Sequence, residues 1–389
     1  MSEISSFKND FQRIKSSYIL TQESIHKINK KRQSNLELLR IIAMLAIIAH
    51  HYVVNSTVVR SFVYDGSATP QQYFLEVWGM WGKTGINAFI LISGYFMCKM
   101  SLTLRRYVKL YIQVFFYGFS IMLIFALCGY QPISVSMVLK KLFGLLISIN
   151  NGFTASFMVF YAFVPFYNKL IESLNRKELL GLVVGLCCVM TICSTFFFAS
   201  TMNEPVWYMT LYFMAAYIRL YPNKYTENLK LSSITLIVSI LIAIAVCLIF
   251  VYITNHTGRQ GFAAFKWYLV TDSNKFLAFL IGLSAFLTAK NIRMGYSKTI
   301  NALAAGCFGV LLIHASSDTM RQWLWLDVCN VPEMLHADLP ILIAQAVAVP
   351  IIIFLVCSFI DLIYKKFIEP FFMSLIFREK RVLKSKGIN

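Results

Sequence analysis

An apolar stretch near the start of the chain, residues 35–52, carries a glutamate, an arginine and two adjacent histidines. Ionisable side chains are costly inside a membrane-spanning helix, so those that occur usually face a cavity or the bundle interior and mark a functional path. At about 100° per residue, Glu37, Arg40 and His51 share one helical face, whereas His50 points about 80° away from Arg40. The stretch therefore predicts a spanning helix with one polar, functional face.

The chemistry that suits this face is proton transfer. Histidine exchanges a proton near physiological pH, and a positioned general base accelerates a reaction about 10²- to 10⁴-fold. His51 is therefore the candidate base. Arg40 lies roughly 16 Å from it along the axis, so we assign Arg40 to substrate or carrier contacts, or to holding the helix start, and Glu37 to orienting neighbouring groups. In the alternative interpretation, Arg40 snorkels to the headgroups and the histidines are hydrogen-bonded interior residues.

Four further basic residues are candidates for contacts with an anionic carrier: Lys83, Arg105, Arg106 and Lys109. Lys83 lies inside an apolar run and is expected to pair with Glu76, seven residues earlier, either to fix packing or beside a substrate cavity. Arg106 and Lys109 are one helical turn apart and are expected to converge on one phosphate. An ordinary cluster of cytoplasmic cations explains the Arg105–Lys109 segment equally well.

A third set of residues is suited to holding a substrate. It consists of His50, Ser93, His314, Trp323 and Trp325. Ser93 is either a cavity hydroxyl or a small residue at a helix crossing, and His314 either binds a substrate or caps its helix together with Asp318. The two tryptophans lie in an acidic outer segment, where they either stack on a ligand or belong to the interfacial aromatic belt, like the other tryptophans near span ends.

The whole composition predicts an all-α integral membrane protein, because 58% of the residues are hydrophobic and only 14% are charged. Residues 1–34 are polar and basic and lack the pattern of a signal peptide. Apolar runs near the spanning length predict a polytopic bundle of about ten transmembrane helices. The expected spans are 36–55, 74–98, 105–129, 150–168, 179–200, 205–221, 231–254, 266–289, 299–315 and 340–364. The stretch 129–149, with Lys140 and Lys141, is a possible re-entrant or interfacial helix.

Most of the 36 lysines and arginines fall in segments that one orientation places inside the cell. Both termini are therefore expected to be cytoplasmic. The net charge of +18 reflects this asymmetry and contact with anionic lipid, and the dispersed charges give no reason to expect nucleic-acid binding. The nine cysteines lie mostly in apolar runs and show neither a disulfide framework nor a metal-site spacing.

Several of these motifs, in this order, resemble the membrane acyltransferase 3 family. The first is Leu39-Arg40 followed after ten residues by His51, with Glu37 three residues before the arginine. The others are Gly82 to Asn87, Ser93 to Phe96, Arg105 to Lys109, Pro165 to Asn168, Tyr212 to Arg219 and Phe308 to His314. The chain looks most like the stand-alone branch that acetylates capsule, exopolysaccharide or other surface glycans.

The resemblance implies an O-acyltransferase of the bacterial plasma membrane, organised as a basic arm (1–34), a transmembrane acyltransferase domain (35–367) and a basic cytoplasmic tail (368–389). Its donor would be acetyl-CoA or another acyl-CoA, with no bound cofactor or metal, and its acceptor a glycan or lipid-linked oligosaccharide. Two other functions stay open from the residues themselves: a transporter or flippase for a lipid-linked sugar or anionic metabolite, and a membrane glycan polymerase.

Overall fold

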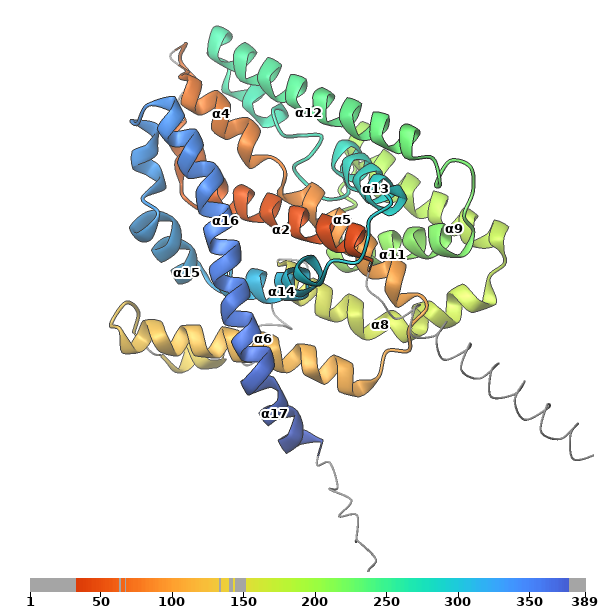
Figure 1. Cartoon of the computed structure of the whole chain (residues 1–389). Coiled ribbons are helices and arrows are strands. Elements are labelled where there is room, and N and C mark those ends of the chain that lie inside the picture. Colours follow the sequence, from red (N-terminus) through yellow and green to blue (C-terminus); the bar gives the residue numbers. More distant parts are fainter. Residues whose placement is uncertain are drawn as a thin grey trace, which may run out of the picture.

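The computed structural model describes residues 33–377, apart from 63, 67, 133, 140–142 and 144–151. The described part contains helices and connecting segments and no β-strand (Figure 1). Residues 1–32 of the expected basic arm, Lys140, Lys141 and most of the basic tail lie outside the described residues. The α-helices are α2 (Ser34–Val54), α3 (Val58–Ser61), α4 (Pro70–Gly79), α5 (Gly82–Met97), α6 (Leu104–Leu127), α8 (Phe153–Ser173), α9 (Arg176–Cys187), α10 (Ser194–Phe196), α11 (Glu204–Leu220), α12 (Leu229–Thr257), α13 (Phe276–Asn291), α14 (Lys298–His314), α15 (Asp318–Gln322), α16 (Leu339–Ile363) and α17 (Glu369–Ile376).

Within this part of the chain, five helical stretches are long and apolar enough to cross a membrane. They are Ser34–Val54, Leu104–Leu127, Arg176–Phe196, Leu229–Thr257 and Leu339–Ile376. A sixth span arises if α14 and the helical stretch Asp318–Val328, which meet at a bend of 98°, are taken together. The all-α, multi-pass membrane class is thus confirmed, whereas the number ten and the sides of the termini stay predictions.

Two of the expected spans have different limits in the structure. The run 74–98 is not one helix, because α4 ends at Gly79 and α5 begins at Gly82. The run 266–289 becomes α-helical only at Phe276, after a short 3₁₀ helix at Gln260–Phe265 and an irregular segment. Residues 79–82 are Gly-Met-Trp-Gly, so hydropathy does not reveal the first break, whereas the second follows the polar segment 271–275, which a scan averaged over a spanning length does not resolve.

Helix starts are fixed by short polar side chains that accept main-chain N–H groups. At the start of α9, Asn175 and Glu178 form a capping box. Thr69, Thr103, Asn203, Asn228 and Ser297 cap α4, α6, α11, α12 and α14 in a similar way. At the other end of α12, Gly258 adopts a φ of +66°, a left-handed conformation that glycine adopts without strain and that ends the helix.

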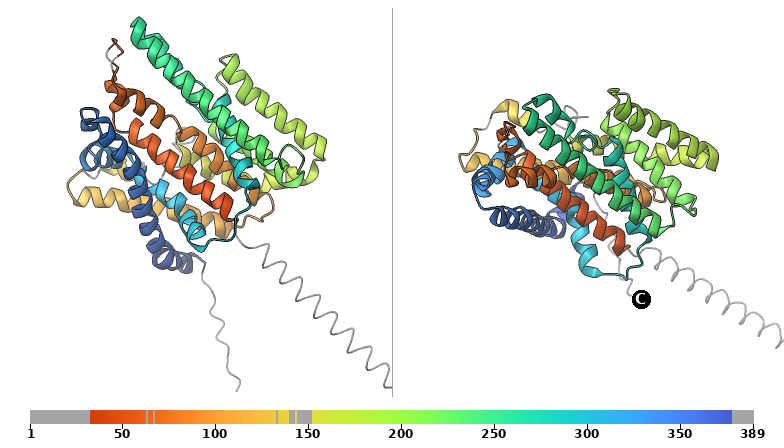
Figure 2. Two further views of the ribbon diagram at one scale, coloured as in Figure 1. Left: turned by 45° about the horizontal axis from the view of Figure 1, so that its top comes forward. Right: turned by 90° about the horizontal axis from the view of Figure 1, so that it is seen from above.

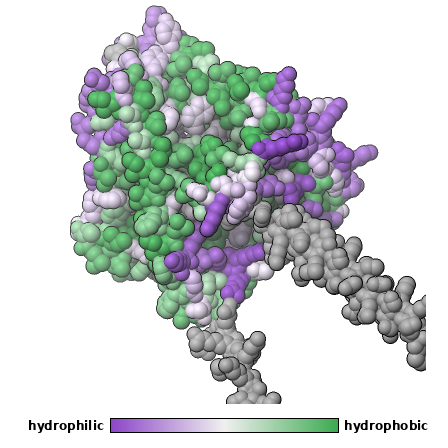
Figure 3. All heavy atoms as spheres, viewed as in Figure 1, coloured by the Kyte–Doolittle hydropathy of each residue, from purple (hydrophilic) through white to green (hydrophobic). Residues whose placement is uncertain are grey.

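The first helix, α2, crosses the middle of the molecule, where it packs against α4, α5, α13, α14 and α16 (Figures 1 and 2). Its large side chains Leu36, Met44, Ile48 and Tyr52 are almost completely buried. In contrast, α12 lies along the upper edge of the molecule in Figure 1 and exposes a row of aliphatic side chains such as Ile237. Hydrophobic residues cover much of the face seen in Figure 3, as expected for a surface in contact with lipid.

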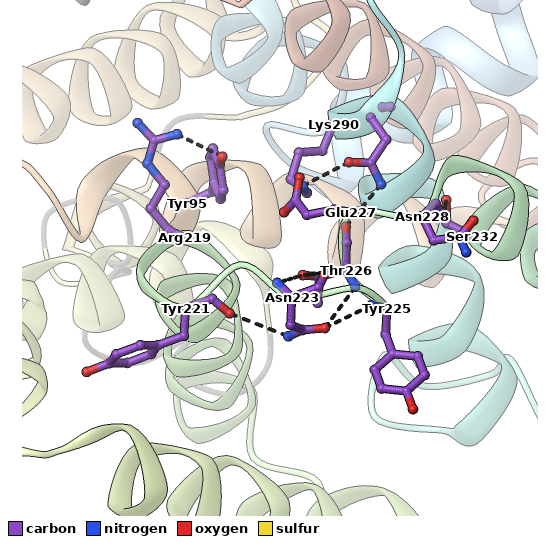
Figure 4. A network of polar contacts seen from close by, with 12 residues as sticks. Tyr95, Arg219, Tyr221, Asn223, Tyr225, Thr226, Glu227, Asn228, Ser232 and Lys290 are labelled. Atoms are coloured by element: carbon purple, nitrogen blue, oxygen red, sulfur yellow. Dashed lines mark hydrogen bonds and ion pairs between the residues drawn. The ribbon is translucent and has the colours of Figure 1, made fainter.

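One end of the bundle is formed by the start of α2 and by the segments 98–103, 221–228 and 292–297; we call it the basic end. Polar contacts tie these parts together (Figure 4). Lys290 at the end of α13 forms an ion pair with Glu227 at 2.7 Å, and Arg219 at the end of α11 donates to the Tyr95 hydroxyl at 2.7 Å. Asn35 donates to the carbonyl of Ala289 at 2.9 Å, which fixes the start of α2 in the same place.

Candidate functional site

A cavity of about 780 Å³ lies at the opposite end of α2, which we call the cavity end. Its walls come from α2, α5, α6, α8, α11, α14 and α15, so segments from across the chain meet there. The lining combines charged and imidazole side chains with hydroxyl and amide groups and with aromatic and aliphatic side chains. The charged and imidazole side chains are those of His50, His51, Lys83, Glu204, Asp318 and Arg321.

His51 and His314 form a hydrogen-bonded pair at this cavity. The Nδ1 atom of His51 lies 3.0 Å from the Nε2 atom of His314, and the Nδ1 atom of His314 lies 2.6 Å from the carbonyl oxygen of Val310. The side chain of His314 is completely buried, at 0% exposure. The pair joins α2 to the last turn of α14, between residues 263 positions apart.

His50 also lines the cavity, so its direction on the helical wheel does not separate it from His51 as the sequence suggested. Its Nδ1 atom lies 2.5 Å from the carbonyl oxygen of Gly79, at the end of α4. A Cβ atom at Gly82 would come within 2.5 Å of the His50 ring, so the absence of a side chain there lets α5 approach α2 closely. His50 is therefore packed into the break between α4 and α5.

Glu37 and Arg40 lie away from the cavity. The Arg40 guanidinium is 3.7 Å from the Glu37 carboxylate and stacks over the Phe89 ring at 5.5 Å. Phe89 in turn packs edge-on against Phe153, which does line the cavity. Arg40 is thus separated from the cavity by a layer of aromatic rings, in agreement with the expectation that it cannot touch His51.

Lys83 lines the cavity, but its expected pairing with Glu76 is wrong. Its ammonium lies 3.9 Å from the carboxylate of Glu204, the first residue of α11 and another lining residue. Sequence reasoning missed Glu204, although a carboxylate that directly precedes the apolar run of α11 was a visible signal. The break after Gly79 places Lys83 and Glu76 on different helices. The seven-residue spacing therefore does not bring the two side chains to one helical face.

Glu76 is instead completely buried in a cluster with Lys266 and Tyr64. Lys266 forms an ion pair with it, and the Tyr64 hydroxyl donates to it at 2.6 Å. Burial, followed by the neighbouring Glu76 carboxylate, raises the pKa of Tyr64, so the phenol stays protonated and remains a donor. Trp267, beside Lys266, donates to the Glu76 carbonyl and packs 6.4 Å from the His50 ring. The cluster thus stabilises the wall behind His50.

The remaining substrate candidates lie in different surroundings. Ser93 donates to the carbonyl of Phe89 at 2.8 Å within α5 and does not line the cavity, and Asp318 pairs with Arg321 at 3.1 Å instead of capping with His314. Trp325 is completely buried against Tyr52 and has no surface for a ligand, which corrects its assignment. Trp323 is 36% exposed and packs on Phe125.

Trp207 lies near the start of the expected span 205–221, and the sequence therefore assigns it to the interfacial aromatic belt, but this prediction is wrong. Its side chain is completely buried, and its indole donates to the Asn87 side chain at 2.9 Å. It is an interior residue of α11 and not a residue of the membrane surface.

The basic residues of α6 lie outside the cavity, toward the basic end. The expected convergence of Arg106 and Lys109 on one anion is not observed, because Lys109 pairs with Glu369 of α17 at 2.7 Å. Arg106 donates to the carbonyl of Ser101 at 2.7 Å, and Arg105 lies over the Phe377 ring. Among residues 33–377 as described, no three His, Cys, Asp or Glu side chains gather as a metal site would require.

A family model described as an acyltransferase domain, that of the acyltransferase 3 family, matches residues 33–365. No curated protein and no solved structure matches the chain. The match includes the first helix with Arg40 and His51, the break before Lys83 and the last turn of α14 with His314. The chain therefore belongs to the acyltransferase 3 family and is a multi-pass membrane acyltransferase.

Proposed function

We propose that the protein transfers an acetyl group from acetyl-CoA to a hydroxyl group of a glycan at the cell surface or on a lipid carrier, with His51 as the general base. The observation that carries this proposal is the position of His51, which lines a cavity large enough for both reacting groups and has a hydrogen-bond partner behind it. Acyl transfer to a hydroxyl needs such a base.

The reaction proceeds by addition and elimination. His51 takes the proton of the acceptor hydroxyl while the hydroxyl oxygen bonds to the thioester carbon, whose carbonyl oxygen becomes an oxyanion. The carbon–sulfur bond then breaks, and the CoA thiolate receives the proton from His51. Lys83 offers a positive charge to the oxyanion from the same cavity, where its ammonium is held only loosely by Glu204 at 3.9 Å.

The lining of the cavity suits a sugar acceptor. Hydroxyl and amide groups from Gln131, Thr154, Ser317 and Thr319 line the same cavity as the ionisable residues and can exchange hydrogen bonds with a polyol. Phe115 and Phe119, which also line the cavity, stack with an interplanar angle of 9° and offer a flat aromatic surface to a sugar ring. A capsular polysaccharide, an exopolysaccharide or a lipid-linked precursor presents such hydroxyl groups.

The donor is expected to approach from the basic end, which would face the cytoplasm of a bacterial cell. Arg105 and Arg106 at the start of α6 would contact its phosphates. The adjacent Tyr107 stacks on Tyr161 of α8, and from there the parallel rings of Phe157 and Phe153 continue to the cavity. We expect the acyl-carrying arm of the donor to follow this row of rings toward His51.

The test is transfer of label from [¹⁴C-acetyl]CoA to the glycan fraction in membranes that contain the protein. His51→Ala should lower the rate at least about 10²-fold, as expected for loss of a general base. His256→Ala, which removes an exposed histidine at the end of α12, is the matched control and should leave the rate unchanged. If wild-type membranes transfer no label but move a lipid-linked glycan across the bilayer, the protein is a transporter and the proposal fails.

A further inference from the structure

We infer that His314 is a positioning residue that selects the reactive tautomer of His51. The inference rests on the proposed role of His51 as the base. It follows from the direction of two hydrogen bonds that run from the backbone of α14, through the His314 ring, to the His51 ring.

The first bond fixes the proton of His314. The carbonyl oxygen of Val310 can only accept a hydrogen bond, and it lies 2.6 Å from the Nδ1 atom of His314. That nitrogen must therefore carry the proton. A neutral His314 then presents a lone pair at Nε2.

The second bond fixes the position of the proton on the His51 ring. Because Nε2 of His314 accepts, the Nδ1 atom of His51 at 3.0 Å must donate, and so the proton of a neutral His51 sits on Nδ1. Its lone pair is then on Nε2, the ring nitrogen that the pair leaves for the acceptor hydroxyl. In the other tautomer Nε2 would carry a proton and would be unable to take another.

The burial of His314 argues that it positions the base and does not itself relay the proton. Its side chain has no exposed surface, and a charged ring there would lose its hydration. The hydrogen-bond partners of the His314 ring are the His51 ring and the Val310 carbonyl, so neither is a carboxylate that would stabilise a charged His314. A proton accepted at Nε2 would also reverse the hydrogen bond to His51 and produce the unreactive tautomer.

Two substitutions separate positioning from relay and from simple packing. In His314→Gln, the side-chain amide can donate to the Val310 carbonyl and its oxygen can accept from His51, but it cannot relay a proton. His314→Leu fills a similar volume and offers neither group. If His314 positions His51, the Gln variant should keep kcat within about tenfold of wild type, while the Leu variant should lose about 10²- to 10⁴-fold with little change in the KM for acetyl-CoA.

Equal loss in both variants would indicate a relay, and equal retention would indicate packing alone; either result overturns the inference. A measurement that does not depend on activity or on any substitution at His314 is ¹⁵N NMR of the wild-type protein in lipid, labelled at its six histidines. The His51 resonances, assigned by their absence in His51→Gln, should show a protonated Nδ1 and an unprotonated Nε2 at neutral pH. A protonated Nε2 would refute the inference even if acetyl transfer is established, whereas missing transfer with the expected tautomer would count against the proposed function only.

Discussion

At the scale of single residues, the two adjacent histidines of α2 differ in what they bind. His50 is tied to a main-chain carbonyl in the break between α4 and α5, whereas His51 is tied to another imidazole. A carbonyl can only accept a hydrogen bond, whereas an imidazole nitrogen can donate or accept. Only His51 therefore has a partner whose own tautomer decides which nitrogen of the ring is protonated. The sequence identified His51, Lys83 and His314 individually from their polar chemistry in apolar surroundings, but their partners lie far away in the chain and had to come from the structure.

Lys83 gives a prediction at this scale, because the structure places it in the cavity with His51 and not with the arginines of α6. Lys83→Met should lower kcat by about 10²- to 10³-fold, the usual effect of removing one group that stabilises an oxyanion, and should leave the KM for acetyl-CoA nearly unchanged. Lys83→Arg, which keeps the charge, should retain more activity. Steady-state kinetics with varied acetyl-CoA distinguish the roles: a raised KM with normal kcat would mean that Lys83 binds the donor phosphates.

At the scale of elements, two interruptions of helices create the site. The break between α4 and α5 places Lys83 at the start of a helix, and the bend of 98° after α14 leaves His314 in a last turn that faces α2. Hydropathy predicted the helices around both features but not the break at residues 80–81, because that break is set by packing. On either side of it, Gly79 approaches Val53 and Gly82 approaches His50, both on α2.

A second glycine contact holds the helix that carries His314. Gly309 of α14 lies against Asp361 of α16, a completely buried carboxylate that accepts from Gln113 at 2.7 Å and from Tyr117 at 3.0 Å and pairs with Lys365 at 2.6 Å. A Cβ atom on Gly309 would overlap the Asp361 carboxylate. The contact therefore fixes the spacing of α6, α14 and α16 and, with it, the position of His314.

We expect Gly309→Ala to destabilise the protein by about 1–3 kcal/mol, the usual cost of overpacking a well-packed site, and to lower acetyl transfer because α14 shifts. Gly306→Ala is the matched control one turn earlier, since its Cβ would lie 3.5 Å from the Ser358 hydroxyl, an ordinary contact. Thermal unfolding in detergent, followed by fluorescence, compares the two variants. Equal melting temperatures for both would contradict this account of the α14–α16 contact.

At the scale of the whole molecule, the sequence predicted the positions of the helices better than it predicted which helices are long enough to cross the membrane. Helices α5, α11, α13 and α14 fall on expected spans, yet each has only 16 or 17 residues. Much of their surface is buried against other helices, so their length and polarity are not set by contact with lipid. A hydropathy scan measures suitability for lipid, which is why it could not decide the number of spans for such interior helices.

The orientation of the whole molecule is the last prediction. Because most lysines and arginines fall in segments that include 221–228 and 292–297, we expect the basic end to face the cytoplasm and the cavity end, with Asp65 and Asp338, to face outward. In a background with the exposed Cys128 and Cys188 replaced by serine, Asp65→Cys and Asp338→Cys should react with an impermeant thiol reagent on intact cells. Lys224→Cys, exposed at the basic end, is the matched control and should react only after lysis. Labelling of Lys224→Cys on intact cells, with protection of the other two, would reverse the orientation and place the mouth of the cavity in the cytoplasm, on the same side as acetyl-CoA.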